Sequence, residues 1–335
     1  MPLHRLTLAL FLAWTTGAAA ADADIDPAHV VAAHVIPGFV ALDDAAQALA
    51  ETAAKRCNPE DTRLRGAYAV AFDAWIRVSH LRFGPTEAGN RGFALAFWPD
   101  SRGATPKALT ALISAEDPVV FSKDDFATVS IAARGFYAME YLLYDPTGAT
   151  QGDGAYRCAL IQAITQDIRA TVADILADWR NGHADLFVTA GRNDVYRSRE
   201  EALQQLFGAL STGLQFSSDT RLGRPMGTFE RPRPARAEAR RAGRSLRHVV
   251  LSLEATRDLA AHLSAGDATL DAAFARAITR ADDLDDPIFA GVADPQGRLR
   301  VELLQQAIDR IRQIVASDLG PRLGVAGGFN ALDGD

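Results

Sequence analysis

A tyrosine and a glutamate near the middle of the chain are the residues whose types and spacing could do chemistry. They are Tyr137 and Glu140, in the run A-R-G-F-Y-A-M-E-Y-L-L-Y-D at residues 133–145. Side chains three residues apart on a helix share a face, so the two would point at one spot. A phenol oxygen and a carboxylate form a hard oxygen pair that suits ferric iron. The simpler interpretation is that both are packed and satisfied by an arginine from a neighbouring helix.

The element that must position this pair is a helix with an apolar stripe. The stripe consists of residues that recur at steps of three and four, namely Phe126, Val129, Ala133, Phe136 and Leu143. Glu140 falls on the same stripe. A carboxylate on a packing surface must find a partner, since an unpaired buried charge costs roughly several kcal/mol.

The motif resembles the signature of the imelysin-like proteins of bacterial envelopes. That signature is G-x-H-x-x-E followed by an apolar run, and the chain has G-F-Y-A-M-E-Y-L-L at residues 135–143, with Tyr137 in the histidine position. Three segments resemble the family pattern ahead of the motif, in the same order: F-D-A-W at 72–75, R-F-G-P at 82–85 and F-W-P-D-S-R-G at 97–103.

Two further segments carry the resemblance after the motif. The run G-R-S-L at 243–246 resembles the S-G-x-S-L element that borders the inter-domain cleft of the family, with Ser245 as the matching residue. The ending G-F-N-A-L-D-G-D at 328–335 resembles the family ending G-F-N-x-x-D-G-D. Its aspartates could hold a hard cation, although the later glutamate of a full calcium loop is absent. The alternatives are a tail that completes the cleft or a flexible terminus.

The resemblance implies an all-α fold of two four-helix bundles related by approximate two-fold symmetry. It also implies a binding cleft between the bundles, and the matching residues of this chain are Tyr137, Glu140, Ser245, Asn330, Asp333 and Asp335. We expect the first bundle within residues 22–190 and the second within residues 191–335. The helical period is clearest over residues 156–180.

The resemblance implies two different activities. The family includes a protein reported as an insulin-cleaving metallopeptidase and periplasmic proteins tied to iron uptake. Tyr137 removes the usual nitrogen ligand and general base. We therefore expect a binding protein for iron, another metal ion or a small ligand, with Tyr137 and Glu140 as candidate metal ligands and envelope iron-uptake components as partners. The alternative is an imelysin-type metallopeptidase with Glu140 in catalysis, so enzyme activity stays open.

Composition and the N-terminal residues indicate the class of protein and its cellular location. The 335 residues are 48% hydrophobic and 23% charged, as in ordinary soluble proteins, and the net charge of -7 argues against a nucleic-acid partner. Residues 1–21 resemble a signal peptide, with Arg5, an apolar run from Leu6 to Trp14 and small residues before Asp22. We expect a periplasmic protein without a lipid anchor, because no cysteine adjoins the cleavage site. No later apolar run approaches the ~20 residues that span a bilayer.

The chain has two cysteines, Cys57 and Cys158. Both lie in the mature part of an exported chain, where oxidation is favoured, so a disulfide is the default prediction. Two buried free thiols, or half of a metal site, are the alternatives.

Other motifs are uninformative or absent. Seven arginines crowd residues 231–247, where a solvated surface is the plain interpretation and a contact with Glu140 or an anionic ligand is the alternative. No H-E-x-x-H, P-loop or G-x-S-x-G motif occurs. No histidine pair has a zinc-like sequence spacing that includes the central helix.

Overall fold

The computed structural model describes residues 24–325, and these residues fold almost entirely into helices. The predicted all-α class is confirmed, since the described residues contain a single isolated β-bridge, between Thr228 and Arg231, and no strand. The predicted signal peptide (residues 1–21) and the tail residues Asn330, Asp333 and Asp335 lie outside the described range.

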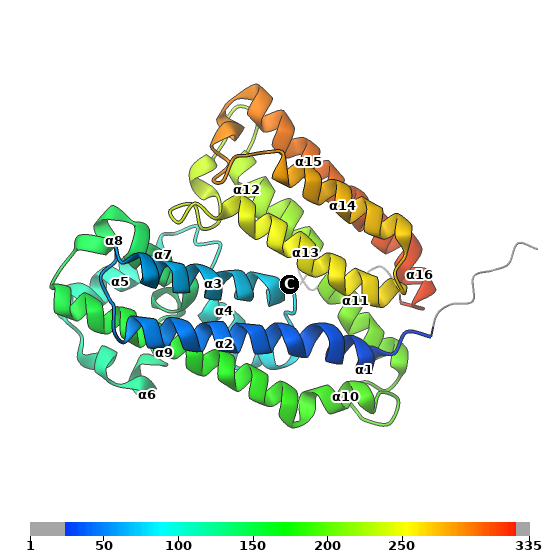
Figure 1. Cartoon of the computed structure of the whole chain (residues 1–335), viewed down its shortest axis with the longest axis horizontal. Helices are drawn as coiled ribbons and strands as arrows, with labels where there is room; N and C mark the ends of the chain where they lie inside the picture. Colours follow the sequence, from blue (N-terminus) through cyan, green and yellow to red (C-terminus); the bar gives the residue numbers. More distant parts are fainter. Residues whose placement is uncertain (1–23, 326–335) are drawn as a thin grey trace, which may run out of the picture.

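The helices form two groups along the chain (Figure 1). The first group contains α1 (Pro27–Val30), α2 (Ile36–Ala53), α3 (Thr62–Val78), α4 (Arg91–Leu95), α5 (Ala104–Ala115), α6 (Lys123–Phe126), α7 (Gly135–Tyr144), α8 (Pro146–Thr150), α9 (Gly154–Asp178) and α10 (Ala184–Val188). The second contains α11 (Arg199–Gln215), α12 (Gly223–Met226), α13 (Ser245–Ser264), α14 (Ala268–Asp282), α15 (Pro295–Ile314) and α16 (Gly320–Arg322).

Each group is built around four helices that pack on one another. In the first, α2 packs on α3 and α9, and α7 packs on α9 and α3. In the second, α13 packs on α11 and α14, and α15 packs on α14 and α11. The groups meet mainly where α3 lies against α13 (Figure 1). This arrangement is consistent with two four-helix bundles, while the two-fold symmetry and the boundary at residue 190 stay predictions.

The N-terminal helix contains a π-helical turn just before a proline. A π-helical turn, Val31–Val35, joins α1 to α2, and Pro37 lies at the start of α2. Proline has no N–H to donate and its ring clashes with the preceding turn of a regular α-helix. The structure therefore has an irregular turn before Pro37 in an otherwise continuous helix.

The disulfide prediction is confirmed. Cys57 and Cys158 are bonded, with Cα atoms 5.0 Å apart and 101 residues between them in sequence. The bond ties the segment between α2 and α3 to the first turn of α9. Closing so long a loop restricts the unfolded chain and holds the first group together.

The central helix is shorter than the sequence predicts, which is a correction. It begins at Gly135, whereas Phe126 ends the separate helix α6 and Ala133 lies in a short 3-10 turn, Ile131–Ala133. Phe126, Ala133 and the apolar residues of α7 still belong to one hydrophobic core. Residues 135–143 are buried on every face, as expected for a helix packed on all sides.

None of the helices within residues 24–325 is both long and apolar enough to cross a bilayer.

Candidate functional site

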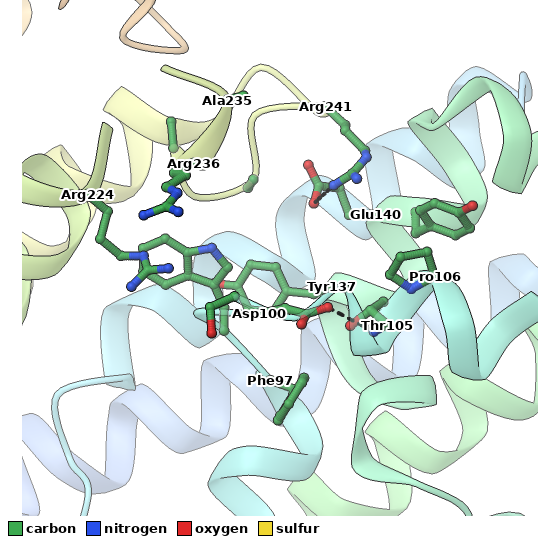
Figure 2. Close-up of a pocket in the computed structure, with 16 residues that line it drawn as sticks. Phe97, Asp100, Thr105, Pro106, Tyr137, Glu140, Arg224, Ala235, Arg236 and Arg241 are labelled. Atoms are coloured by element: carbon green, nitrogen blue, oxygen red, sulfur yellow. Dashed lines mark hydrogen bonds and ion pairs between the residues drawn. The ribbon is translucent and has the colours of Figure 1, made fainter. Parts of the chain in front are cut away.

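A cavity of about 300 Å³ lies beside α7 at the junction of the two helix groups. Its walls are formed by residues 97–106, by Tyr137, Glu140 and Tyr141 of α7, by Arg224 of α12, and by residues 235–241 of the segment that leads to α13. Figure 2 shows the arginines of the second group facing α7 and the 97–106 segment across this space. The volume is at the lower end of the range for small-molecule pockets.

The start of α7 is fixed by a glycine and an ion pair. Gly135 has φ +71°, and a Cβ there would lie 2.2 Å from the carbonyl oxygen of Leu95. Only glycine allows both the left-handed backbone and this close approach. Arg134 donates two hydrogen bonds to Asp167 of α9, of 2.9 and 2.7 Å, in the bidentate geometry that holds a guanidinium rigidly. The glycine of the motif therefore has a structural explanation.

Tyr137 forms the floor of the cavity and is tied to an acid of the second group. Its hydroxyl donates a hydrogen bond to Oε1 of Glu238. Burial, and then the nearby Glu238 carboxylate, raise the pKa of Tyr137 well above its usual value. The phenol is therefore protonated, and its ring lies near Trp98, with centroids 6.3 Å apart.

Glu238 is a buried carboxylate at the centre of a charged network. Its Oε2 accepts a 2.7 Å hydrogen bond from Nε of Arg221 and lies 3.2 Å from Nδ1 of His248. Burial alone would raise the pKa of Glu238, but Arg221 and His248 outweigh it and lower the pKa to about 2. The carboxylate is ionised because the guanidinium beside it favours the charged form. Arg221 also donates to the hydroxyl of Ser252 at 2.7 Å.

Glu140 is buried but makes weaker contacts than Glu238. Its Oε1 accepts a 3.2 Å hydrogen bond from the backbone N–H of Ala242, and its Oε2 lies 3.9 Å from Arg241. Arg241 is closer to Asp145, with 2.6 Å between Nε and Oδ2. Burial raises the pKa of Glu140, and Arg241 and the backbone donors reduce that shift without cancelling it.

The structure brings only part of the predicted cleft together. Tyr137 and Glu140 line the same cavity but contact different partners, Glu238 and Ala242. Ser245 is not among the lining residues, since its hydroxyl donates a 2.6 Å hydrogen bond to the backbone carbonyl of Glu238 from behind the wall. It orients the segment that carries the acid.

The arginine-rich segment is only partly the solvated surface that the sequence predicts. Residues 227–244 are mostly turns and loops, with one short 3-10 turn at Pro234–Arg236, and the regular helix begins at Ser245. Arg244 and Arg247 both pair with Asp73 of α3. The alternative of a contact between this segment and Glu140 is realised by Arg241, which also pairs with Asp145.

The sequence did not single out Glu238, Arg221 or His248. Their separation along the chain gives no local pattern, because Glu238 comes from the loop, Arg221 from the π-helical segment Phe216–Leu222 that follows α11, and His248 from α13. The one available signal was that Glu238 is one of two acids within the arginine-rich run at residues 230–247. A lone acid among many bases is expected to be paired.

Two histidines and an aspartate form a cluster away from the cavity. Nε2 of His34 lies 3.0 Å from Nε2 of His80, and Nδ1 of His34 lies 2.7 Å from Oδ2 of Asp258. These residues join α1–α2, the end of α3 and α13. They are 46 and 224 residues apart in sequence, which is why no spacing motif predicted the cluster.

The donor set of the cavity does not fit a bare metal ion held by Tyr137 and Glu140. The Tyr137 hydroxyl donates a hydrogen bond to Glu238 and stays protonated, so its oxygen is a poor metal ligand, and Glu140 already accepts from a backbone N–H. Three arginines also line the space and would repel a cation. Within residues 24–325 no group of three His, Cys, Asp or Glu side chains is placed to hold a metal ion.

Comparisons with known proteins agree with the sequence resemblance. The model of the Imelysin family matches residues 35–315. An imelysin-like protein from Psychrobacter arcticum 273-4 has a similar structure, with TM-score 0.75 and 21% identity over 90% of this chain and 96% of that chain. An iron-regulated protein A precursor from Parabacteroides distasonis ATCC 8503 has TM-score 0.72 and 11% identity over 89% of this chain and 96% of that chain. Among curated proteins none matches the sequence.

Proposed function

The chain belongs to the imelysin family, and we propose that it is a periplasmic binding protein of iron uptake whose ligand enters the cavity beside α7. The observation that carries this proposal is the bond from Tyr137 to Glu238. Because of this bond, the side chain at the histidine position of the motif is a protonated phenol. Such a group is suited to hold a ligand and poorly suited to take up a proton near neutral pH.

The other groups of the cavity also favour binding over hydrolysis. Asp100 accepts 2.8 Å hydrogen bonds from the backbone N–H groups of both Ala104 and Thr105, so its carboxylate caps the start of α5. None of the described residues that line the cavity is a histidine. Asp100, Tyr137 and Glu140 are each held by hydrogen bonds to other protein groups, which is how a site is organised for binding in advance of the ligand.

Two features support an envelope location. Residues 1–21 have the composition of a secretory signal, and the disulfide between Cys57 and Cys158 is of the kind that persists in oxidising compartments. The connection with iron is supported by the Parabacteroides neighbour, which is described as iron-regulated. Because the cavity does not suit a bare ion, we propose that iron enters with other ligands already attached.

One observation favours a second function, the metallopeptidase of the sequence resemblance. Burial raises the pKa of Glu140, and a carboxylate with a raised pKa in a pocket is a candidate for proton transfer. Tyr137 argues against it, since a peptidase of this kind needs a metal with an open position or an activated water.

Calorimetry on the purified protein would measure binding of ferric iron, offered as its citrate complex. A second assay would test for cleavage of protein substrates with added zinc. We expect binding without cleavage, and Glu140→Gln should keep the fold. Zinc-dependent cleavage by the wild type that is lost in Glu140→Gln would establish the peptidase instead. Failure of the wild type to bind any form of iron would refute the iron-uptake assignment.

A further inference from the structure

We propose that the cavity recognises its ligand as a small polycarboxylate anion, which Arg224 and Arg236 bind. This inference rests on the proposed function, and it names the chemical class of the ligand. Its basis is an imbalance of charge inside the cavity, where the acids have partners and two of the bases have none.

The acids of the cavity are already satisfied. Asp100 caps α5 through two backbone N–H groups, and these donors lower the pKa of Asp100 although burial alone would raise it. Glu140 accepts from Ala242 and faces Arg241, while Arg241 pairs with Asp145. Neither carboxylate lies within 4.0 Å of the guanidinium of Arg224 or Arg236, and Glu140 lies beside Arg241 instead.

Arg224 and Arg236 are the unbalanced cations. Within residues 24–325 neither guanidinium has an acidic group within 4.0 Å, whereas Arg241, the third arginine of the wall, does. Figure 2 shows the guanidinium groups of Arg224 and Arg236 close together on one side of the cavity. Burial and the neighbouring Arg236 lower the pKa of Arg224, as expected when two like charges approach.

Arg224 also has an unused donor. Its Nε is buried and makes no hydrogen bond to the described atoms. Its guanidinium carbon lies 5.8 Å from the ring centroid of Trp98, so the indole face supports the group and limits its movement. A planar guanidinium that is fixed on one side and has unused donors matches the two oxygens of a carboxylate.

The form of the ligand follows from these positions. Two neighbouring guanidinium groups can each bind one carboxylate, so a molecule with two or three carboxylates fits better than one with a single charge. A cavity of about 300 Å³ restricts the choice to a small molecule. Such a molecule can arrive free or as its ferric complex, and in the complex the metal keeps its own oxygen ligands and needs none from Tyr137 or Glu140.

Calorimetry would compare citrate, ferric citrate, inorganic phosphate and glycerol on the wild type, Arg224→Gln, Arg236→Gln and the double variant. Arg233→Gln is the matched control, because Arg233 lies in the same exposed segment and does not line the cavity. Arg236→Lys tests for the guanidinium itself. We expect each glutamine variant to weaken citrate binding at least tenfold, the lysine variant to recover only part of the loss, and the control to match the wild type.

The outcomes separate this inference from the proposed function. Citrate and ferric citrate that bind equally well, and that both depend on the arginines, support the polycarboxylate site and count against a dedicated iron function. Ferric iron that binds only without citrate, depends on Glu140 and ignores the arginines would overturn the inference and leave the iron function standing. Binding of phosphate more tightly than citrate, binding of glycerol, or the absence of anion binding would also overturn it.

Discussion

Replacing Glu238 with glutamine removes one charge from the buried pair with Arg221. The two side chains are 2% and 3% exposed, so water cannot take the place of the lost partner. Glutamine has nearly the same shape and can still accept the hydrogen bond from Tyr137. The guanidinium of Arg221 would keep its hydrogen bond to Ser252 but would have no counter-ion among the described residues.

The size of the effect can be worked from the pKa of Glu238. The pKa of this carboxylate is about 2 in the folded protein, against an ordinary value of 4.5. A difference of roughly two and a half pKa units corresponds to about 3 kcal/mol of stability at neutral pH. Removing one partner of a buried ion pair costs about 3–5 kcal/mol in other proteins, which is the same range.

The pH dependence has a definite sign. The folded pKa of Glu238 is depressed, so the stabilisation is present above about pH 4.5, the unfolded value, and is lost as the pH falls toward about 2. Urea unfolding of the oxidised protein, followed by circular dichroism, would compare wild type and Glu238→Gln near pH 7 and pH 3. Glu230→Gln is the matched control, because Glu230 is an exposed acid on the same segment.

Two results would refute this reasoning. One is a loss below about 1 kcal/mol for Glu238→Gln at neutral pH, the size expected of an exposed pair. The other is an equal loss near pH 7 and pH 3, which would mean that the charge is not what stabilises the wild type. A double variant with Arg221→Met should be more stable than Glu238→Gln alone, since it removes the unpaired cation.

Three further predictions concern the fold. Gly135→Ala should destabilise the protein by several times more than Gly89→Ala in thermal unfolding, because both glycines have positive φ but a Cβ meets backbone atoms only at Gly135. Cys57→Ser with Cys158→Ser should lower the free energy of unfolding by about 4 kcal/mol, and an unchanged urea midpoint would contradict this. Burial lowers the pKa of His80 well below its usual value. The unfolded chain therefore takes up a proton at a higher pH than the folded protein, so the free energy of unfolding should fall as the pH drops below about 6.5. Urea unfolding near pH 5.5 should show a smaller fall for His80→Leu than for the wild type.

The helical class could be predicted because helical periodicity is local information. The pattern over residues 156–180 gave α9 within two residues of its observed ends, Gly154 and Asp178. The disulfide was predictable as well, since two cysteines in an exported chain leave one pairing. Both inferences needed no knowledge of how distant segments pack.

The start of α7 could not be predicted from periodicity. The apolar stripe continues back to Phe126, yet the chain turns at Arg134 and Gly135 because Gly135 must pass close to the carbonyl of Leu95. That contact joins segments 40 residues apart, and the turns before it still bury their apolar residues in the same core. An apolar pattern therefore shows which residues are buried and does not show where a helix begins.

The partners of the motif were not predictable for a related reason. Tyr137 and Glu140 line the same cavity, but Glu238 reaches Tyr137 from 101 residues away. The arginine run at residues 231–247 was predicted to be a solvated surface, because runs of charge usually face water. Arg241, Arg244 and Arg247 are held by Asp145 and Asp73 instead.

The tyrosine at position 137 lies between two charged regions. Behind it, Arg221 and Glu238 neutralise each other in the dry interface between the helix groups. In front of it, Arg224 and Arg236 face the cavity without acidic partners in the described range. Burial and the nearby Glu238 carboxylate raise the pKa of Tyr137 well above its usual value, so no charge is added between these two regions. The phenol gives Glu238 the hydrogen bond it needs and stays neutral, so the stability of the interface is kept independent of the charge that enters the cavity.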